Sequence, residues 1–210
     1  MRKKSHRGYD FLSPVYDALV RIVFHDQLDV AQRTFLHVLS KGQKVLIVGG
    51  GSGKILEAID QLNMPLEVTF LDASEKMIKR ASSRILKNIE LQFTTCRIES
   101  FQADGNYDVL ITPFFLDLFE GRRLKEAIEK LAKTLTQKGI WLVTDFQPTG
   151  KLTHMLLSKV MYVFFKITTR IKAWGLSDYF RLISEEKMIL KEVKTYRNGF
   201  IKSGWYVKNG

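Results

Sequence analysis

The segment Val45–Gly53 (V-L-I-V-G-G-G-S-G) constrains the fold more than any other part of the sequence. A β-branched apolar run meets four glycines within five positions, and Lys54–Ile59 then has a helical pattern. The segment therefore predicts a buried strand, a turn with almost no side chains and the start of a helix. Because glycine has no Cβ, a ligand can lie directly against the backbone of such a turn.

The spacing of the glycines distinguishes three kinds of nucleotide-binding loop. A phosphate-binding P-loop would need a glycine at Val48 and a hydroxyl residue after Lys54, and the sequence has neither. A dinucleotide-binding G-x-G-x-x-G loop that starts at Gly49 would need a glycine at position 54. The pattern that fits is G-x-G-x-G at Gly49, Gly51 and Gly53.

Strand-like and helical patterns alternate along the rest of the chain. The predicted strands are 44–48, 67–71, 89–94, 107–111 and 140–145, and the predicted helices are 54–62, 74–87 and 122–135. Near the C-terminus, Asn198-Gly199 separates strands predicted at 192–197 and 200–207, which indicates a hairpin. We therefore predict an α/β fold with a doubly wound, Rossmann-like, mostly parallel seven-stranded sheet and a C-terminal antiparallel hairpin.

Composition limits the environment and the partners. The chain of 210 residues has 33 basic and 22 acidic side chains, a net charge of +11, which raises the question of nucleic acid or an anionic membrane as partner. Its one cysteine, Cys96, excludes an internal disulfide framework and indicates a reducing compartment. No secretory signal is apparent, and the most apolar segment, Met155–Ile167, is too short and too charged to span a membrane. We expect a soluble, cytoplasmic protein.

The glycine pattern resembles the first motif of the class I S-adenosylmethionine-dependent methyltransferases, whose loop passes under the amino-acid part of the cofactor. An α/β sheet that ends in an antiparallel hairpin is the topology of that family. In addition, Tyr9–Asp17 (Y-D-F-L-S-P-V-Y-D) is similar to the N-terminal element of the ubiquinone/menaquinone-biosynthesis C-methyltransferases and their small-molecule relatives. The resemblance covers most of residues 9–145 and implies that Tyr16 faces the cofactor.

The resemblance also implies an organisation of the whole chain. We expect residues 1–210 to form a single methyltransferase domain. Its parts are an N-terminal helical cap (9–40), a cofactor-binding core (41–145), an insert or lid (146–190) and the C-terminal hairpin (191–208).

Asp72 is the residue we expect to bind the ribose. It ends the second predicted strand about 20 residues after the glycine loop, where an acidic side chain can accept hydrogen bonds from both ribose hydroxyls. Its alternative role is to cap the following helix. The resemblance implies further cofactor contacts from the glycine loop and from residues after the second, third and fourth strands: Gly49, Gly50, Gly51, Gly53, Ala73, Met77, Arg97, Ile98 and Thr112.

Two positions depart from the family pattern. Relatives place an acidic residue two positions before the first glycine, where this chain has Ile47. Many relatives also carry Asp or Asn where Arg97 stands, and arginine can only donate hydrogen bonds to the adenine. The loop is similar as well to that of the aminopropyltransferases, but Ser52 replaces their acidic residue and their N-terminal β-domain is missing.

Residues 151–172 form an insert after the fifth strand. Its apolar side chains follow helical spacing, and residues 151–182 carry six basic side chains against one acidic. The insert has three interpretations: a helix packed in the core, which is the default, a substrate lid, or a helix in peripheral contact with a membrane.

The expected reaction is methyl transfer from S-adenosylmethionine to a small acceptor, apolar or quinone-like. Phenols and enols need deprotonation, and the candidate bases are His154, Asp117, Tyr16 and His25, none of which stands out. No metal site is predicted. The alternatives are a nucleic-acid methyltransferase, favoured by the net charge, an aminopropyltransferase-like enzyme and a non-catalytic cofactor-binding protein.

Overall fold

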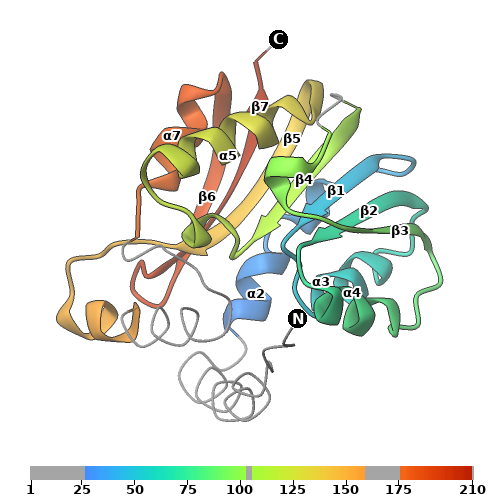
Figure 1. Cartoon of the computed structure of the whole chain (residues 1–210), viewed down its shortest axis with the longest axis horizontal. Coiled ribbons are helices and arrows are strands. Elements are labelled where there is room, and N and C mark those ends of the chain that lie inside the picture. The colour runs from blue at the N-terminus through green and yellow to red at the C-terminus, as the bar shows by residue number, and fades with distance from the viewer. Residues whose placement is uncertain (1–26, 103–105, 159–175, 210) are drawn as a thin grey trace, which may run out of the picture.

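A computed structural model describes residues 27–102, 106–158 and 176–209 (Figure 1). The strands are β1 (Lys44–Val48), β2 (Leu66–Asp72), β3 (Ile89–Thr95), β4 (Tyr107–Pro113), β5 (Leu135–Phe146), β6 (Met188–Tyr196) and β7 (Ile201–Lys208). The α-helices are α2 (Gln27–Arg33), α3 (Lys54–Asp60), α4 (Glu75–Ser82), α5 (Gly121–Lys133) and α7 (Tyr179–Glu185), with short 3₁₀ helices η1 (Leu36–Val38), η2 (Ile98–Ser100) and η3 (Leu116–Leu118).

The seven strands form one sheet in the order β3-β2-β1-β4-β5-β7-β6. The first five pair in parallel, whereas β7 pairs antiparallel with β5 and β6. The predicted Rossmann-like sheet with its C-terminal hairpin is therefore confirmed. Because β1 and β4 are neighbours, the loops that follow these two strands leave the sheet side by side at its carboxyl edge.

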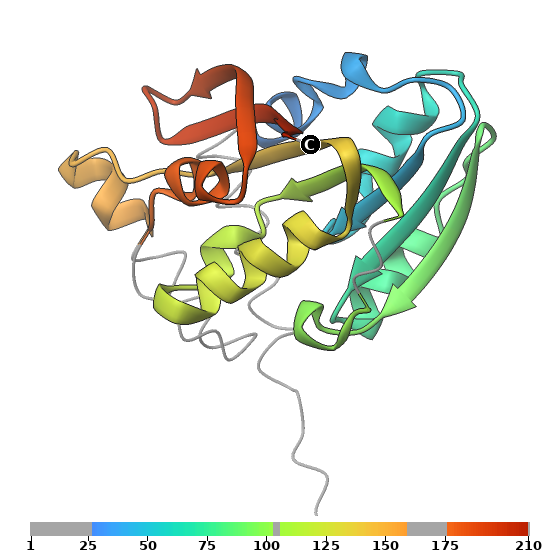
Figure 2. The same cartoon turned by 90° about the horizontal axis from the view of Figure 1, so that it is seen from above.

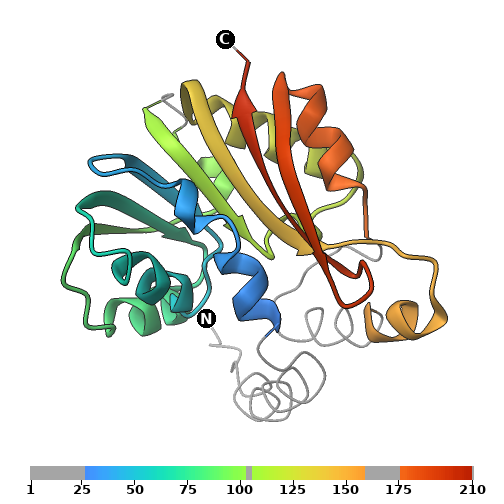
Figure 3. The ribbon, with the colours of Figure 1, turned by 180° about the vertical axis from the view of Figure 1, so that it is seen from behind.

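Strand β1 is buried on both faces, which explains its continuous apolar run. Side chains alternate across a strand, so Val45 and Ile47 pack on one face with α3 and η1, while Leu46 and Val48 pack on the other with α5 and α7. Figures 1 and 3 show the two layers, with α5 and α7 in front of the sheet in Figure 1 and α2 in front of it in Figure 3.

Two predicted boundaries differ in the structure. Helix α4 ends at Ser82 rather than at residue 87, because Ser82 and Ser83 bond through their hydroxyls to the carbonyls of Lys79 and Arg80. Ile85 therefore leaves the helical pattern and is 89% exposed. The hairpin loop is also longer than the predicted two residues, since Tyr196 pairs with Ile201 and residues 197–200 form the turn.

The described start of the insert exposes most of its apolar side chains. Residues 152–158 are helical and lie at the β6–β7 end of the sheet (Figures 1 and 2). Leu152 is 82% exposed, Leu156 65% and Met155 47%, whereas Leu157 packs partly against the cluster of Phe146 and Phe200. These apolar residues follow helical spacing, but the face of the helix on which they lie is largely exposed. The apolar positions 160, 163, 167 and 171 lie outside the described residues.

Candidate functional site

The glycine loop leaves β1 in a conformation that only glycine adopts easily. Gly49, Gly51 and Gly53 have φ angles of +72°, +57° and +76°, in the left-handed region. The N–H of Gly49 donates to the carbonyl of Leu71 at 2.9 Å, and Gly53 is the N-cap of α3. The alternating glycines of the G-x-G-x-G pattern are therefore set by the path of the backbone.

Most of the loop glycines are also required by packing. A Cβ on Gly49 would lie 2.4 Å from the ring of Phe115, one on Gly50 2.4 Å from the ring of Phe70, and one on Gly53 2.8 Å from a side-chain carbon of helix α4. A Cβ on Gly51 would meet no described atom within 4 Å. Of the four loop glycines, Gly51 is thus the position beside which a ligand has room.

Asp72 ends β2 and joins the loop to the next helix. Its Oδ2 accepts a hydrogen bond from the N–H of Gly51 at 3.3 Å, and its Oδ1 accepts one from the N–H of Ser74 at 2.8 Å. The N-cap of α4 is Ser74, whose hydroxyl accepts from the N–H of Met77 at 3.4 Å, so the alternative role of Asp72 as the helix cap is wrong. Partial burial raises the pKa of Asp72, and the two backbone hydrogen bonds oppose that shift. The carboxylate keeps acceptor sites for two further donors.

The other predicted contact residues lie along the carboxyl edge with different exposure. Ala73 and Arg97 are exposed, Met77 is half-buried, and Ile98 packs in the core. Thr112 is fully buried, and its hydroxyl accepts a hydrogen bond from the indole N–H of Trp141 at 2.9 Å. The side chain of Thr112 therefore faces the core, which leaves only its backbone for a ligand.

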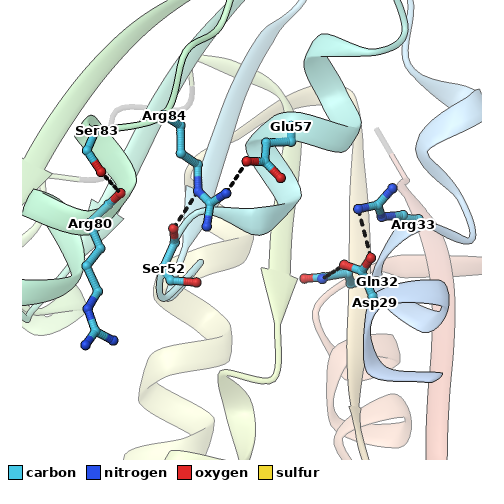
Figure 4. A network of polar contacts seen from close by, with 8 residues as sticks. All are labelled: Asp29, Gln32, Arg33, Ser52, Glu57, Arg80, Ser83 and Arg84. Atoms are coloured by element: carbon cyan, nitrogen blue, oxygen red, sulfur yellow. Dashed lines mark hydrogen bonds and ion pairs between the residues drawn. The ribbon is translucent and has the colours of Figure 1, made fainter. Parts of the chain in front are cut away.

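Arg84 holds the glycine loop from outside, and sequence analysis did not identify it. Its Nε donates to the carbonyl oxygen of Ser52 at 2.7 Å, and its Nη1 donates to the carboxylate of Glu57 in α3 (Figure 4). One guanidinium thus ties the loop to the helix that follows it. No local motif could indicate this contact, because Arg84 and Ser52 are far apart in the sequence.

The end of β4 turns sharply beside the glycine loop. Phe114 has a positive φ of +51°, which is uncommon for a residue with a side chain, and its N–H donates to the carbonyl of Thr144 at 2.7 Å. Its ring lies 4.9 Å from the ring of Phe146, centroid to centroid. Phe115 is buried against Gly49. The turn therefore directs both rings into packing contacts.

Two carboxyl groups are buried just after this turn. Asp145, near the end of β5, accepts hydrogen bonds from the N–H groups of Leu116 at 2.8 Å and Phe146 at 2.9 Å. Asp117 lies in η3, and no described residue donates to its buried Oδ1. Burial raises the pKa of Asp145 to about 7, and burial together with the charge of Asp145 raises the pKa of Asp117 well above its usual range. Sequence analysis named Asp117 and missed Asp145.

The remaining base candidates are not brought to the loop by the described structure. The Nδ1 of His154 lies 2.7 Å from the hydroxyl of Thr149, and its ring lies 4.7 Å from that of Phe200. Partial burial and the positive charges of Lys151 and Arg197 lower its pKa. His154 belongs to the segment at the β6–β7 end, away from α3 and α4 (Figures 1 and 2). Tyr16 and His25 lie outside the described residues.

Part of the chain is similar to a known protein family. The family model described as a methyltransferase domain matches residues 46–141, from β1 through the glycine loop and Asp72 into β5. The match covers just under half of the chain. The matched residues include most of the predicted cofactor contacts and Asp117, while Asp145 and the hairpin lie beyond them. The finer resemblance to the ubiquinone-biosynthesis enzymes has no counterpart in these matches.

Solved structures share the fold of this chain at low sequence identity. A chain in the complex between the Haloferax volcanii Trm112 methyltransferase activator and a methyltransferase aligns over 100% of both chains, with a TM-score of 0.71 and 13% identity. A SAM-dependent methyltransferase from Methanosarcina mazei aligns over 82% of this chain and 95% of its own, with a TM-score of 0.61 and 17% identity.

The N-methyltransferase NodS from Bradyrhizobium japonicum aligns over 90% of this chain and 100% of its own, with a TM-score of 0.62 and 13% identity. Among curated proteins the sequence has no match. At these identities the likeness concerns the fold, so the substrate has to be argued from the chain itself.

Proposed function

We propose that this protein is an S-adenosylmethionine-dependent methyltransferase that acts on a small, apolar or quinone-like acceptor. The observation that carries the proposal is the pairing of Gly51 with Asp72. Gly51 offers a bare backbone with open space beside it, and the carboxylate that accepts its N–H keeps further acceptor sites at the same edge of the sheet. The match of residues 46–141 to a methyltransferase family model and the fold of the structural neighbours support the same proposal.

Each predicted contact has a role in this proposal. The backbone of the loop residues Gly49, Gly50, Gly51 and Gly53 lies under the amino-acid part of the cofactor. Asp72 accepts the ribose hydroxyls, Ala73 and Met77 contact the adenine, and Arg97, Ile98 and Thr112 contribute backbone groups. Tyr16 closes the pocket from the N-terminal segment, which lies outside the described residues.

The chemical demands on the protein are modest. When bound, S-adenosylmethionine supplies a methyl group that is already activated by its sulfonium. The chain has to align the acceptor with that methyl group, exclude water and receive the acceptor's proton. A rigid loop, held by Arg84 through Ser52 and Glu57, suits the alignment because a small misplacement of the reacting atoms costs much of the rate.

Calorimetry with S-adenosylhomocysteine tests the proposed cofactor. We expect saturable binding with a Kd on the order of micromolar, which corresponds to about 8 kcal/mol. The absence of binding at high micromolar concentrations would refute the cofactor assignment. Transfer of a labelled methyl group into separate lipid, RNA and small-molecule extracts then identifies the class of acceptor. Label only in the RNA would favour the nucleic-acid alternative, for which the net charge of +11 is the argument.

We further propose that the acceptor is met at an anionic membrane surface. The described helical residues 152–158 expose Leu152, Met155 and Leu156, and Lys151 beside them is also exposed. In the sequence, residues 151–182 carry six basic side chains and one acidic. Exposed apolar side chains with basic neighbours are typical of helices that lie in the membrane interface. In the described part of the chain, no helix combines the length and the hydropathy that crossing a membrane requires.

We expect the full chain to co-sediment with vesicles that contain anionic lipid and to bind uncharged vesicles more weakly. Replacing Leu152 and Leu156 together by serine should weaken the binding about tenfold or more, because each leucine loses roughly 1 kcal/mol of apolar burial at the interface. Ile85→Ser is the matched control, since Ile85 is 89% exposed but lies after α4, far along the chain from the insert. Equal binding by the double variant and the wild type would contradict the membrane contact.

We place the protein in the reducing cytoplasm, on the single Cys96 of the sequence. A protein partner is a further option, because one structural neighbour was solved with the Trm112 methyltransferase activator.

A further inference from the structure

Two buried carboxyl groups, Asp117 in η3 and Asp145 near the end of β5, are not among the residues that we assign to the ribose, adenine or amino-acid parts of the cofactor. We call Asp117 and Asp145 the acid pair. Asp145 is 0% exposed and Asp117 is 3% exposed. Isolated carboxylates are rarely buried in this way, because leaving water is costly for a charged group unless a counter-charge repays it.

Asp145 is held in place by the backbone. Its two oxygens accept from Leu116 and Phe146, and the N–H groups of Phe115 and Asp117 also point toward it. These donors favour a negative charge on Asp145. The strand end and the turn of η3 therefore form a fixed cradle for one anion.

Asp117 is the second acid beside this cradle, and its Oδ1 lacks a donor among the described residues. Lys202, the cross-strand partner of Asp145 on β7, has its ammonium group 4.1 Å from the centre of the Phe180 ring, and the arginines on the adjoining helix α5 have acidic partners. Arg122 pairs with Glu126, and Arg123 pairs with Glu99 at the surface. Among the described residues, the charged group that acts on Asp117 is Asp145, and two like charges that are both buried keep at least one proton between them.

The acid pair adjoins the position where the proposed function puts the reacting sulfur. Phe115, two residues before Asp117, packs directly on Gly49, and β4 is the neighbour of β1 in the sheet. The substrate carries a positive sulfonium there, whereas the product S-adenosylhomocysteine carries a neutral thioether. A cation near a buried carboxyl favours the ionised acid, and the effect is large where water is excluded.

We propose that the acid pair matches the charge of the sulfonium, releasing a proton when S-adenosylmethionine binds and recovering one when the methyl group leaves the sulfur. In the transfer step the acceptor's X–H electron pair forms the X–CH₃ bond, and the electrons of the broken C–S bond stay on sulfur. The acceptor's proton goes to the acid pair, directly or through water. The acid pair thus regains its proton at the moment when the sulfur becomes neutral. This inference rests on the proposed function.

Calorimetry of the full chain with the two ligands at pH 7 tests the inference. Titrations in buffers of different ionisation enthalpy count the protons released on binding. We expect S-adenosylmethionine to release about one proton more than S-adenosylhomocysteine. Both ligands carry the same α-amino group, so its contribution cancels in the difference. By linkage, the ratio of S-adenosylmethionine affinity to S-adenosylhomocysteine affinity should rise about tenfold or more between pH 6 and pH 8.

Variants test whether the proton that is released on binding comes from the acid pair. Asp117→Asn leaves Asp145 as the one titratable acid of the pair, so the difference in proton release should fall to roughly half and the affinity ratio should depend less on pH. Asp108→Asn is the matched control, because Asp108 lies at the opposite end of β4, where it accepts the N–H of Lys44 at 2.9 Å. This control should behave as the wild type does.

The outcomes separate this inference from the proposed function. If neither ligand binds the wild type, the cofactor assignment fails and the inference fails with it. If both ligands bind and release equal numbers of protons, the cofactor assignment stands and the acid pair does not sense the sulfonium. The wild-type measurement decides this even if Asp117→Asn does not fold, and thermal unfolding of each variant shows whether it does.

Discussion

Asp72→Ala is expected to weaken S-adenosylhomocysteine binding about 100-fold. Two hydrogen bonds from ribose hydroxyls to a carboxylate contribute about 1.5 kcal/mol each, and the variant loses both. It also frees the N–H groups of Gly51 and Ser74, so the loop beside the ligand loses an anchor. The measurement is calorimetric Kd together with the melting temperature.

Asp60→Ala is the matched control for this variant. The Oδ1 of Asp60 accepts the backbone N–H groups of Lys87 at 2.9 Å and Asn88 at 2.7 Å, so it too anchors two donors from a following segment. Asp60 ends α3, however, and lies away from the carboxyl edge of β2. Both variants should lose similar stability, but only Asp72→Ala should lose affinity. An equal Kd for Asp72→Ala and Asp60→Ala would remove Asp72 from the ribose site.

The loop glycines are expected to divide into a structural and a ligand-facing class. Gly49→Ala should lower the free energy of unfolding by about 3 kcal/mol and the melting temperature by about 10 °C, because its Cβ would lie 2.4 Å from the ring of Phe115 and its φ is +72°. Gly51→Ala should cost only the backbone strain of about 1 kcal/mol, since no described atom lies within 4 Å of its Cβ.

Ligand binding should follow the opposite order. The methyl group of Gly51→Ala would stand in the open space that we assign to the ligand, so we expect its Kd for S-adenosylhomocysteine to rise about tenfold or more with a small change in stability. Gly42→Ala is the control, because Gly42 also has a positive φ of +79° and open space around it but lies before β1. Unchanged affinity of Gly51→Ala would show that the ligand does not approach this part of the loop.

The fold could be predicted from local patterns for a physical reason. A strand buried on both faces needs an uninterrupted apolar run, and a left-handed turn needs glycine, so Val45–Gly53 carries its structure in its own residues. Asn198-Gly199 indicated the hairpin in the same way, although the loop it forms spans residues 197–200. The end of α4 was predicted wrongly because the hydroxyls of Ser82 and Ser83 form hydrogen bonds with backbone carbonyls of the helix. The periodicity of apolar residues contains no sign of these bonds.

Within the candidate site, the sequence predicted the position of a residue only where that residue stands at the end of a strand. The position of Asp72 beside the glycine loop could be predicted because Asp72 is the last residue of β2. Helical spacing alone does not say which face of the insert meets the core, and Leu152 and Leu156 are exposed. The packing of the insert as a whole stays a prediction, since residues 159–175 lie outside the described residues. His154 could be named from its residue type, but its distance from the loop is a matter of topology.

By itself, the sequence determined the succession of strands and helices along the chain, the glycine turn and the acidic residue at the end of β2. Each of these features depends on neighbours within a few positions. Only the tertiary structure decided that Arg84 holds the loop through Ser52 and that Asp117 and Asp145 are buried together. These contacts join residues from separate elements, and they exist because β4 and β5 pair in the sheet and α4 packs beside the loop. Charge and hydrogen bonding between distant positions leave no periodic pattern in the chain.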